Sequence, residues 1–200
     1  GVTVKPIKLI SGASPFCETF FDNARVEKKN LVGELNRGWT VGKRLLQHER
    51  SSISGLNTGG RRGRYDDMRP LPEIAKEYVG LVDGKLADET LRNAVIDNQM
   101  DYRAFGLTQR RAMEENESGG TPGFATSMFK YFGSEIGKDR LEIQLKAMGT
   151  QSLGWEGEEF TDEERTLTRS WLRSKGNSIA GGTAEVQLNI IAKRVLGLPD

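Results

Sequence analysis

The sequence predicts a mainly α-helical protein in which an antiparallel bundle of four helices follows a short β segment. Two patterns lead to this prediction. Residues 1–35 contain short runs of alternating β-branched and polar side chains, which are typical of strands. From residue 36 onward, apolar side chains recur at helical spacing over long stretches, which is typical of helices that pack against one another. We therefore expect two parts, residues 1–35 and residues 36–200.

Strands are expected in two stretches of the first part. Residues 1–10 alternate β-branched and polar side chains and are predicted to form one or two strands. Residues 16–26 are predicted to form a pair of strands with a turn at Asp22-Asn23, because Asp and Asn favour turns. Residues 30–34 then lead out of the β part as a loop.

Start and stop signals bound the helices of the second part. Asp88 is a predicted N-cap, and Thr161 with Glu164 predicts a capped helix start. Gly, Arg and Asp crowd residues 54–70, which we expect to be a solvated loop, and residues 118–123 form a second break. The expected helices span residues 36 or 38 to 56, 71–79, 88–117, 124–148, 162–174 and 184 to about 196.

The C-terminal segment is the first candidate site. Gly181-Gly182 is predicted to form a hinge, and Thr183 is predicted to cap a helix that ends before Gly197 and Pro199. A helix that opens on two glycines exposes unpaired backbone N–H groups, which suit a carbonyl, an oxyanion or a phosphate. The alternative is a capped terminal helix without a ligand.

A carboxylate on the first predicted helix is the second candidate. Glu49 falls in one helical stripe with apolar residues at steps of four and three, namely Val41, Leu45, Ile53 and Leu56. Burial on such a face would favour the neutral carboxyl, which makes Glu49 a competent general base near neutral pH. Alternatively, Glu49 lies at the edge of the stripe and pairs with a neighbouring cation.

Composition excludes several classes of function. The formal net charge is +1, so no overall field favours nucleic acid as a partner. Single Cys17 and single His48 exclude a disulfide framework and the usual zinc sites, and we expect no metal. Because no apolar run is long enough to span a membrane and no signal peptide is present, we expect no membrane partner and a cytoplasmic location, or the mitochondrial matrix in a eukaryote.

Two phrases of the sequence resemble one known family. Residues 181–199 read GGTAEVQLNIIAKRVLGLP, and residues 16–34 read FCETFFDNARVEKKNLVGE. Both are similar to signatures of the acyl-CoA dehydrogenase family. The resemblance implies that residues 1–35 are the last strands of a truncated middle β-domain and that residues 36–200 are the C-terminal helical bundle domain. It also implies FAD-dependent α,β-dehydrogenation of an acyl-CoA thioester to a 2,3-enoyl-CoA.

The resemblance also implies roles for individual residues. The phrase Gln47-His48-Glu49-Arg50 matches one branch of the family in which the glutamate takes the α-proton, and Arg50 matches a position that orients the substrate. Other members place the glutamate where this chain has Gly181, which strengthens Glu49 as the base. The backbone N–H of Gly181 would polarise the thioester carbonyl. The remaining matches are positions that contact the flavin: Gly149, Gly182, Thr183 and Glu185.

Partners follow from the same resemblance. The family assembles into dimers and tetramers through the helical bundle with flavin between subunits, and an electron-transfer flavoprotein or a similar protein accepts the electrons. Two departures support an alternative, a non-catalytic or flavin-poor assembly subunit that pairs with a flavin-bearing partner. The family arginine before Phe-Gly has no counterpart near residues 78–85, and Lys146 stands where glutamine is usual.

Overall fold

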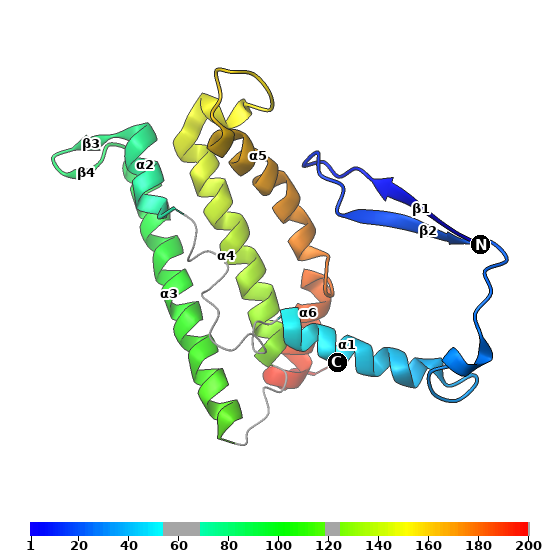
Figure 1. The fold of residues 1–200 in the computed structure, drawn as a ribbon. Coiled ribbons are helices and arrows are strands. Elements are labelled where there is room, and N and C mark those ends of the chain that lie inside the picture. The colour runs from blue at the N-terminus through cyan, green and yellow to red at the C-terminus, as the bar shows by residue number, and fades with distance from the viewer. Residues whose placement is uncertain (54–68, 119–124, 200) are drawn as a thin grey trace.

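The computed structural model describes residues 1–53, 69–118 and 125–199. Most of these residues are helical, as predicted, and Figure 1 shows the helices gathered into a bundle with a β-hairpin beside it. The elements are β1 (Val2–Ile7), β2 (Phe16–Phe21), a 3-10 turn (Lys28–Asn30), α1 (Gly38–Ile53), α2 (Leu71–Val79), β3 (Leu81–Val82), β4 (Lys85–Leu86), α3 (Glu89–Glu117), α4 (Ala125–Met148), a 3-10 segment (Gly149–Leu153), α5 (Asp162–Ser174), a second 3-10 segment (Lys175–Ser178), α6 (Ala184–Ile190) and a π-helical continuation (Ile191–Val195).

The N-terminal hairpin pairs β1 with β2 in antiparallel register, from Val2 opposite Phe21 to Ile7 opposite Phe16. The strand pair predicted within residues 16–26 is wrong, because the chain leaves the sheet after Phe21. The bend at Asn23, with φ +50, turns the following residues away from β2, and they pair with no described strand. Both faces of this hairpin are exposed.

Three long helices, α3, α4 and α5, form an antiparallel bundle (Figure 1). The local signals that predicted their starts are confirmed. The Leu91 N–H donates to Asp88 Oδ1 at 2.8 Å, and Thr161 and Glu164 form a complete capping box at the start of α5. The bounds of α2 are those predicted. The predicted loop at 54–70 and the break at 118–123 fall largely outside the described residues.

The apolar core lies where α2 meets the bundle. One buried cluster joins α2, α3 and α4, and a second joins α4 and α5. Close packing extends toward the other end of α3 and α4, where the Phe105 and Phe129 rings meet edge to face at 6.0 Å. Gly133 makes room for this pair, since a Cβ there would lie 3.1 Å from Phe105 Cζ. The buried members of the two clusters are Leu71, Ala75, Leu91, Val95, Ile143 and Ala147 in the first, and Leu141, Met148 and Leu167 in the second.

A second hairpin, β3–β4, lies between α2 and α3 and was not predicted. Asp83 and Gly84 occupy its turn with φ of +51 and +75. Two successive left-handed residues define the type I′ turn that Asp-Gly favours, so the sequence did contain a signal for this hairpin. The hairpin occupies the part of the chain in which the family arginine is missing.

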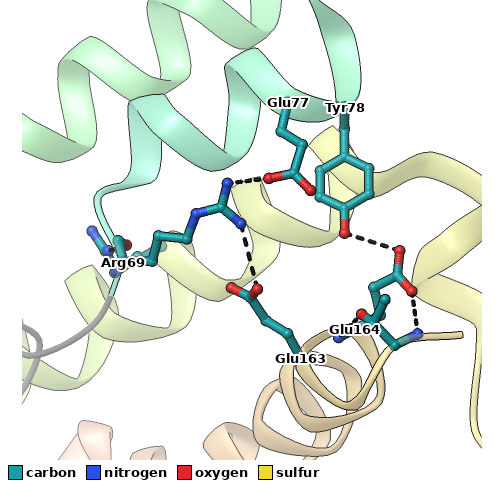
Figure 2. Close-up of polar contacts among 7 residues, drawn as sticks. Arg69, Glu77, Tyr78, Glu163 and Glu164 are labelled. Atoms are coloured by element: carbon teal, nitrogen blue, oxygen red, sulfur yellow. Dashed lines mark hydrogen bonds and ion pairs between the residues drawn. The ribbon is translucent and has the colours of Figure 1, made fainter.

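Polar contacts tie α2 to α5 across the bundle (Figure 2). The Tyr78 hydroxyl donates to Glu164 Oε1 at 2.9 Å, and the Thr161 N–H donates to Glu164 Oε2 at 2.7 Å. Arg69 pairs with Glu77 and, at 3.4 Å, with Glu163. The N–H of Thr161 is the main reason why the pKa of Glu164 is lowered, while burial and the carboxylate raise the pKa of Tyr78.

Removing the tyrosine hydroxyl tests this tie. Tyr78→Phe leaves the carboxylate of Glu164, which is 5% exposed, with one donor fewer, so we expect the free energy of unfolding to fall by about 1–2 kcal/mol. The matched control is Tyr131→Phe, whose hydroxyl bonds to no described residue and whose removal should change stability by about 0.5 kcal/mol or less. Urea unfolding measures both variants. Equal losses would show that the bond does not couple α2 to α5.

The lowered pKa of Glu164 makes stability depend on pH. Its folded-state pKa lies below the unfolded value of about 4.3, so its contribution is complete above that value and disappears as pH falls through the folded-state pKa. Glu164→Gln should therefore be less stable at pH 7 and lose less of its remaining stability on acidification. Unfolding free energies between pH 3 and pH 7 measure this difference, and parallel curves for the two proteins would contradict it.

Candidate active site

The C-terminal turn is built from two glycines in left-handed conformations. Gly181 and Gly182 have φ of +69 and +93, values that residues with side chains rarely adopt. The Gln187 side chain, 7% exposed, donates from Nε2 to the Gly181 carbonyl at 3.2 Å. A Cβ on Gly182 would lie 2.6 Å from the same Nε2 atom, so the closed turn requires glycine.

The predicted cap on α6 is confirmed. The Val186 N–H donates to Thr183 Oγ1 at 3.3 Å, and the Thr183 hydroxyl hydrogen-bonds to the carboxylate of Glu185. Hydrogen bonds from its own backbone N–H and from Thr183 lower the pKa of Glu185. The N–H groups of Gly181 and Gly182, by contrast, donate to no described residue and remain open to a ligand.

Two lysines of α4 lie beside the segment that carries this turn. Lys138 Nζ donates to Ser178 Oγ at 2.5 Å and pairs with Glu135 at 2.8 Å. Lys130 is 9% exposed, and its amino group has no hydrogen-bond partner among the described residues. Burial lowers the pKa of Lys130, while Glu135 and Glu185 act in the opposite direction. The sequence did not indicate this pair, because most helical lysines are solvated.

Glu49 lies on α1 and is exposed. The expected burial of its stripe is wrong within this chain, since Val41 and Leu45 are also exposed, the latter at 68%. The reason is geometric, because α1 packs against α4 near one end and otherwise extends away from the bundle (Figure 1). Arg50 belongs to α1, but its side chain lies outside what the structure describes.

Gly149 lies far from the other predicted site residues. It has φ +57 and begins the segment after α4, whereas α6 packs at the end where α4 begins (Figure 1). Because α4 rises about 1.5 Å per residue, Lys138, which contacts Ser178 just before the turn, is about 17 Å along the helix axis from Gly149. A single chain thus places Glu49's helix and α6 near the start of α4 and Gly149 after its C-terminal end, with the segment that leads into the glycine turn beside Ser134 and Lys138.

The described residues contain neither a metal-binding cluster nor a helix suited to spanning a membrane. No group of three or more His, Cys, Asp or Glu residues there is arranged to hold a metal ion. Likewise, none of the helices formed by residues 1–53, 69–118 and 125–199 combines the length and the apolar composition needed to cross a bilayer.

Comparison with known proteins extends the resemblance to the whole chain. The acyl-CoA dehydrogenase IpdE1 of Mycolicibacterium smegmatis is 34% identical over 200 residues, which is 100% of this chain and 46% of that protein. The mitochondrial short/branched chain specific acyl-CoA dehydrogenase of Bos taurus is 25% identical and aligns with 93% of this chain and 40% of its own length. The chain therefore spans about half the length of the curated relatives it matches.

Solved structures share the fold. The ChsE4-ChsE5 complex from Mycobacterium tuberculosis matches with a TM-score of 0.72 at 22% identity, over 100% of this chain and 51% of that chain. A glutaryl-coenzyme A dehydrogenase in complex with glutaryl-CoA matches with a TM-score of 0.70 at 21% identity, over 100% of this chain and 48% of that chain. The family model for the acyl-CoA dehydrogenase C-terminal domain covers residues 36–196. The chain belongs to the acyl-CoA dehydrogenase family.

Proposed function

We propose that this chain is the C-terminal part of an FAD-dependent enzyme that dehydrogenates an acyl-CoA thioester to the 2,3-enoyl-CoA. The observation that carries the proposal is the glycine turn, in which Gly181 and Gly182 present open N–H groups. This turn lies in a chain whose relatives are named acyl-CoA dehydrogenases. Residues 1–35 would complete the middle β-domain of that enzyme, and residues 36–200 would form its helical domain.

Three groups of the chain share the proposed chemistry. Glu49 takes the α-proton of the thioester, and Arg50 orients the substrate beside it. The Gly181 N–H donates to the thioester carbonyl, which stabilises negative charge as the proton leaves. Gly182, Thr183 and Glu185 would contact FAD, which would supply the redox chemistry as the acceptor of the hydride from the β-carbon. An electron-transfer flavoprotein or a similar protein would serve as the final electron acceptor.

The cofactor fits the described residues only in part. The turn formed by Gly181, Gly182 and Thr183 leaves backbone N–H groups open for contact with a flavin, and the exposed Glu185 side chain follows it at the start of α6. Gly149, the other proposed contact, follows the C-terminal end of α4, about 17 Å along the helix axis from Lys138, whose Nζ contacts Ser178 just before the turn. We therefore propose that the flavin lies between subunits, with Gly149 contributed by a second chain of a homodimer, homotetramer or heteromer.

An assembly subunit without its own chemistry is the second candidate. The absence of a counterpart to the family arginine near residues 78–85 supports this alternative; these residues form the end of α2 and most of the β3–β4 hairpin. Two matched structures bear titles that pair two components, the ChsE4-ChsE5 complex from Mycobacterium tuberculosis and the Tcur3481-Tcur3483 steroid ACAD. On this alternative, a partner chain carries the flavin and the base.

Neutralising the proposed base separates these two functions. Glu49→Gln should slow flavin reduction by an acyl-CoA at least about 100-fold, because general-base catalysis contributes on the order of 10²–10⁴. After the enzyme is mixed anaerobically with the acyl-CoA, the loss of flavin absorbance at about 450 nm measures flavin reduction. The control is Glu34→Gln, an exposed glutamate outside α1. Unchanged reduction by the Glu49 variant of a flavin-loaded assembly would favour the assembly-subunit function.

The glycine turn can be tested separately. Gly182→Ala introduces a Cβ at φ +93 and against Gln187 Nε2, so we expect a loss of about 1–3 kcal/mol of stability and a lower ratio of bound flavin to protein. Gly106→Ala is the control, because a Cβ at that helical position meets no atom within 4 Å and should be neutral or stabilising. Urea unfolding and flavin absorbance measure both effects. Normal flavin content in the Gly182 variant would contradict the proposed contact.

A further inference from the structure

A groove lies between α2, the β3–β4 hairpin and α3, with a volume of about 340 Å³. This volume is within the range of about 300–1,000 Å³ typical of small-molecule sites. The hairpin and α2 lie at the end of the bundle opposite α6 (Figure 1), so the groove is remote from the Gly181–Thr183 turn. None of the groups assigned to dehydrogenation lines it.

Cations line this groove without matching carboxylates. Lys76, Lys85 and Arg92 belong to its wall, and no Asp or Glu is among the described residues that form it. Arg92 pairs with Glu89 at 3.1 Å on the solvent side. The amino groups of Lys76 and Lys85 form no ion pair with any described residue, so two positive charges remain available to a ligand.

Apolar side chains form the rest of the wall. Val95 is 4% exposed and belongs to the core, so it gives the groove a dry floor. Leu81 and Ile96 are nearly half exposed although both are large and apolar. Exposure of these apolar side chains to water is unfavourable, and a ligand whose apolar part covers them would remove that cost.

We propose that this groove binds a free carboxylate that carries an apolar chain. The carboxylate would accept from the amino groups of Lys76 and Lys85, and the chain would lie over Val95 and between Leu81 and Ile96. The charge of the wall selects an anion, and its apolar floor selects against small inorganic ions. The small volume of the groove favours a single small molecule over a peptide or a membrane surface.

The test uses a photoreactive diazirine analogue of decanoate and the complete protein as purified with its partner chains. Irradiation should attach the analogue to residues within 71–99, located by peptide mass spectrometry. Decanoate should compete with labelling, whereas decanol and butyrate should compete poorly because each lacks one of the two matching features. Raised salt should also weaken labelling, since the charge contacts are near solvent.

Charge removal supplies the matched variants. Lys76→Ala combined with Lys85→Ala should weaken decanoate competition about tenfold, because two charge-assisted contacts are lost. Lys28→Ala removes an equally exposed cation far from the groove and should change nothing. Flavin reduction by an acyl-CoA should be unchanged in the double variant, which keeps this inference separate from the proposed dehydrogenation.

Four outcomes would overturn the inference. These are labelling only outside residues 71–99, equal competition by decanol, tighter binding of an acidic peptide, and capture by anionic phosphatidylglycerol vesicles that decanoate does not relieve. The last two would assign the groove to a protein segment or to a membrane surface.

Discussion

One helix, α4, determines how the described structure is organised. Every other α-helix of the described chain packs against it: α3 runs along it, α2 contacts its C-terminal part, α5 lies beside it, and α6 and α1 pack near its start (Figure 1). Side chains of α4 are therefore buried on several sides of the helix. They include the apolar residues Ile143 and Ala147 and the polar residue Gln144, which is completely buried. The glycine turn and Gly149 lie beside different parts of this helix, which is the basis of the proposal that two chains share the site.

The packing around α4 leaves apolar surfaces of the β1–β2 hairpin and of α1 exposed. Both faces of the β1–β2 hairpin are exposed, and so are apolar residues of α1 such as Trp39 and Leu45. Large exposed apolar patches are typical of surfaces that pack against another domain or chain. Since the chain spans about half the length of its curated relatives, we propose that the remaining half of such a protein covers these surfaces. Glu49 would then become buried only on assembly.

Local signals in the sequence predicted most of the fold, and tertiary effects account for the misses. The capping box at Thr161, the cap at Thr183 and the bounds of α2 depend on neighbouring residues and were predicted correctly. A β-strand, however, needs backbone hydrogen bonds to a neighbouring strand. The segment after Phe21 has no such neighbour among the described residues, so it is not a strand. The exposure of Glu49 and the burial of Lys130 depend on how helices meet, which spacing within one helix does not specify. The β3–β4 hairpin does have a local signal, because the Asp83-Gly84 dipeptide favours a type I′ turn.

The central proposal is that the flavin site needs two chains, because Gly149 follows the C-terminal end of α4, whereas the segment before the turn contacts Ser134 and Lys138 farther back along the helix. Native mass spectrometry of the purified flavoprotein tests this claim most directly, since it reports flavin and chain stoichiometry together. The account predicts that flavin appears only in species with at least two polypeptides and is released when they separate. A single polypeptide that carries this chain and retains a full equivalent of flavin would contradict it.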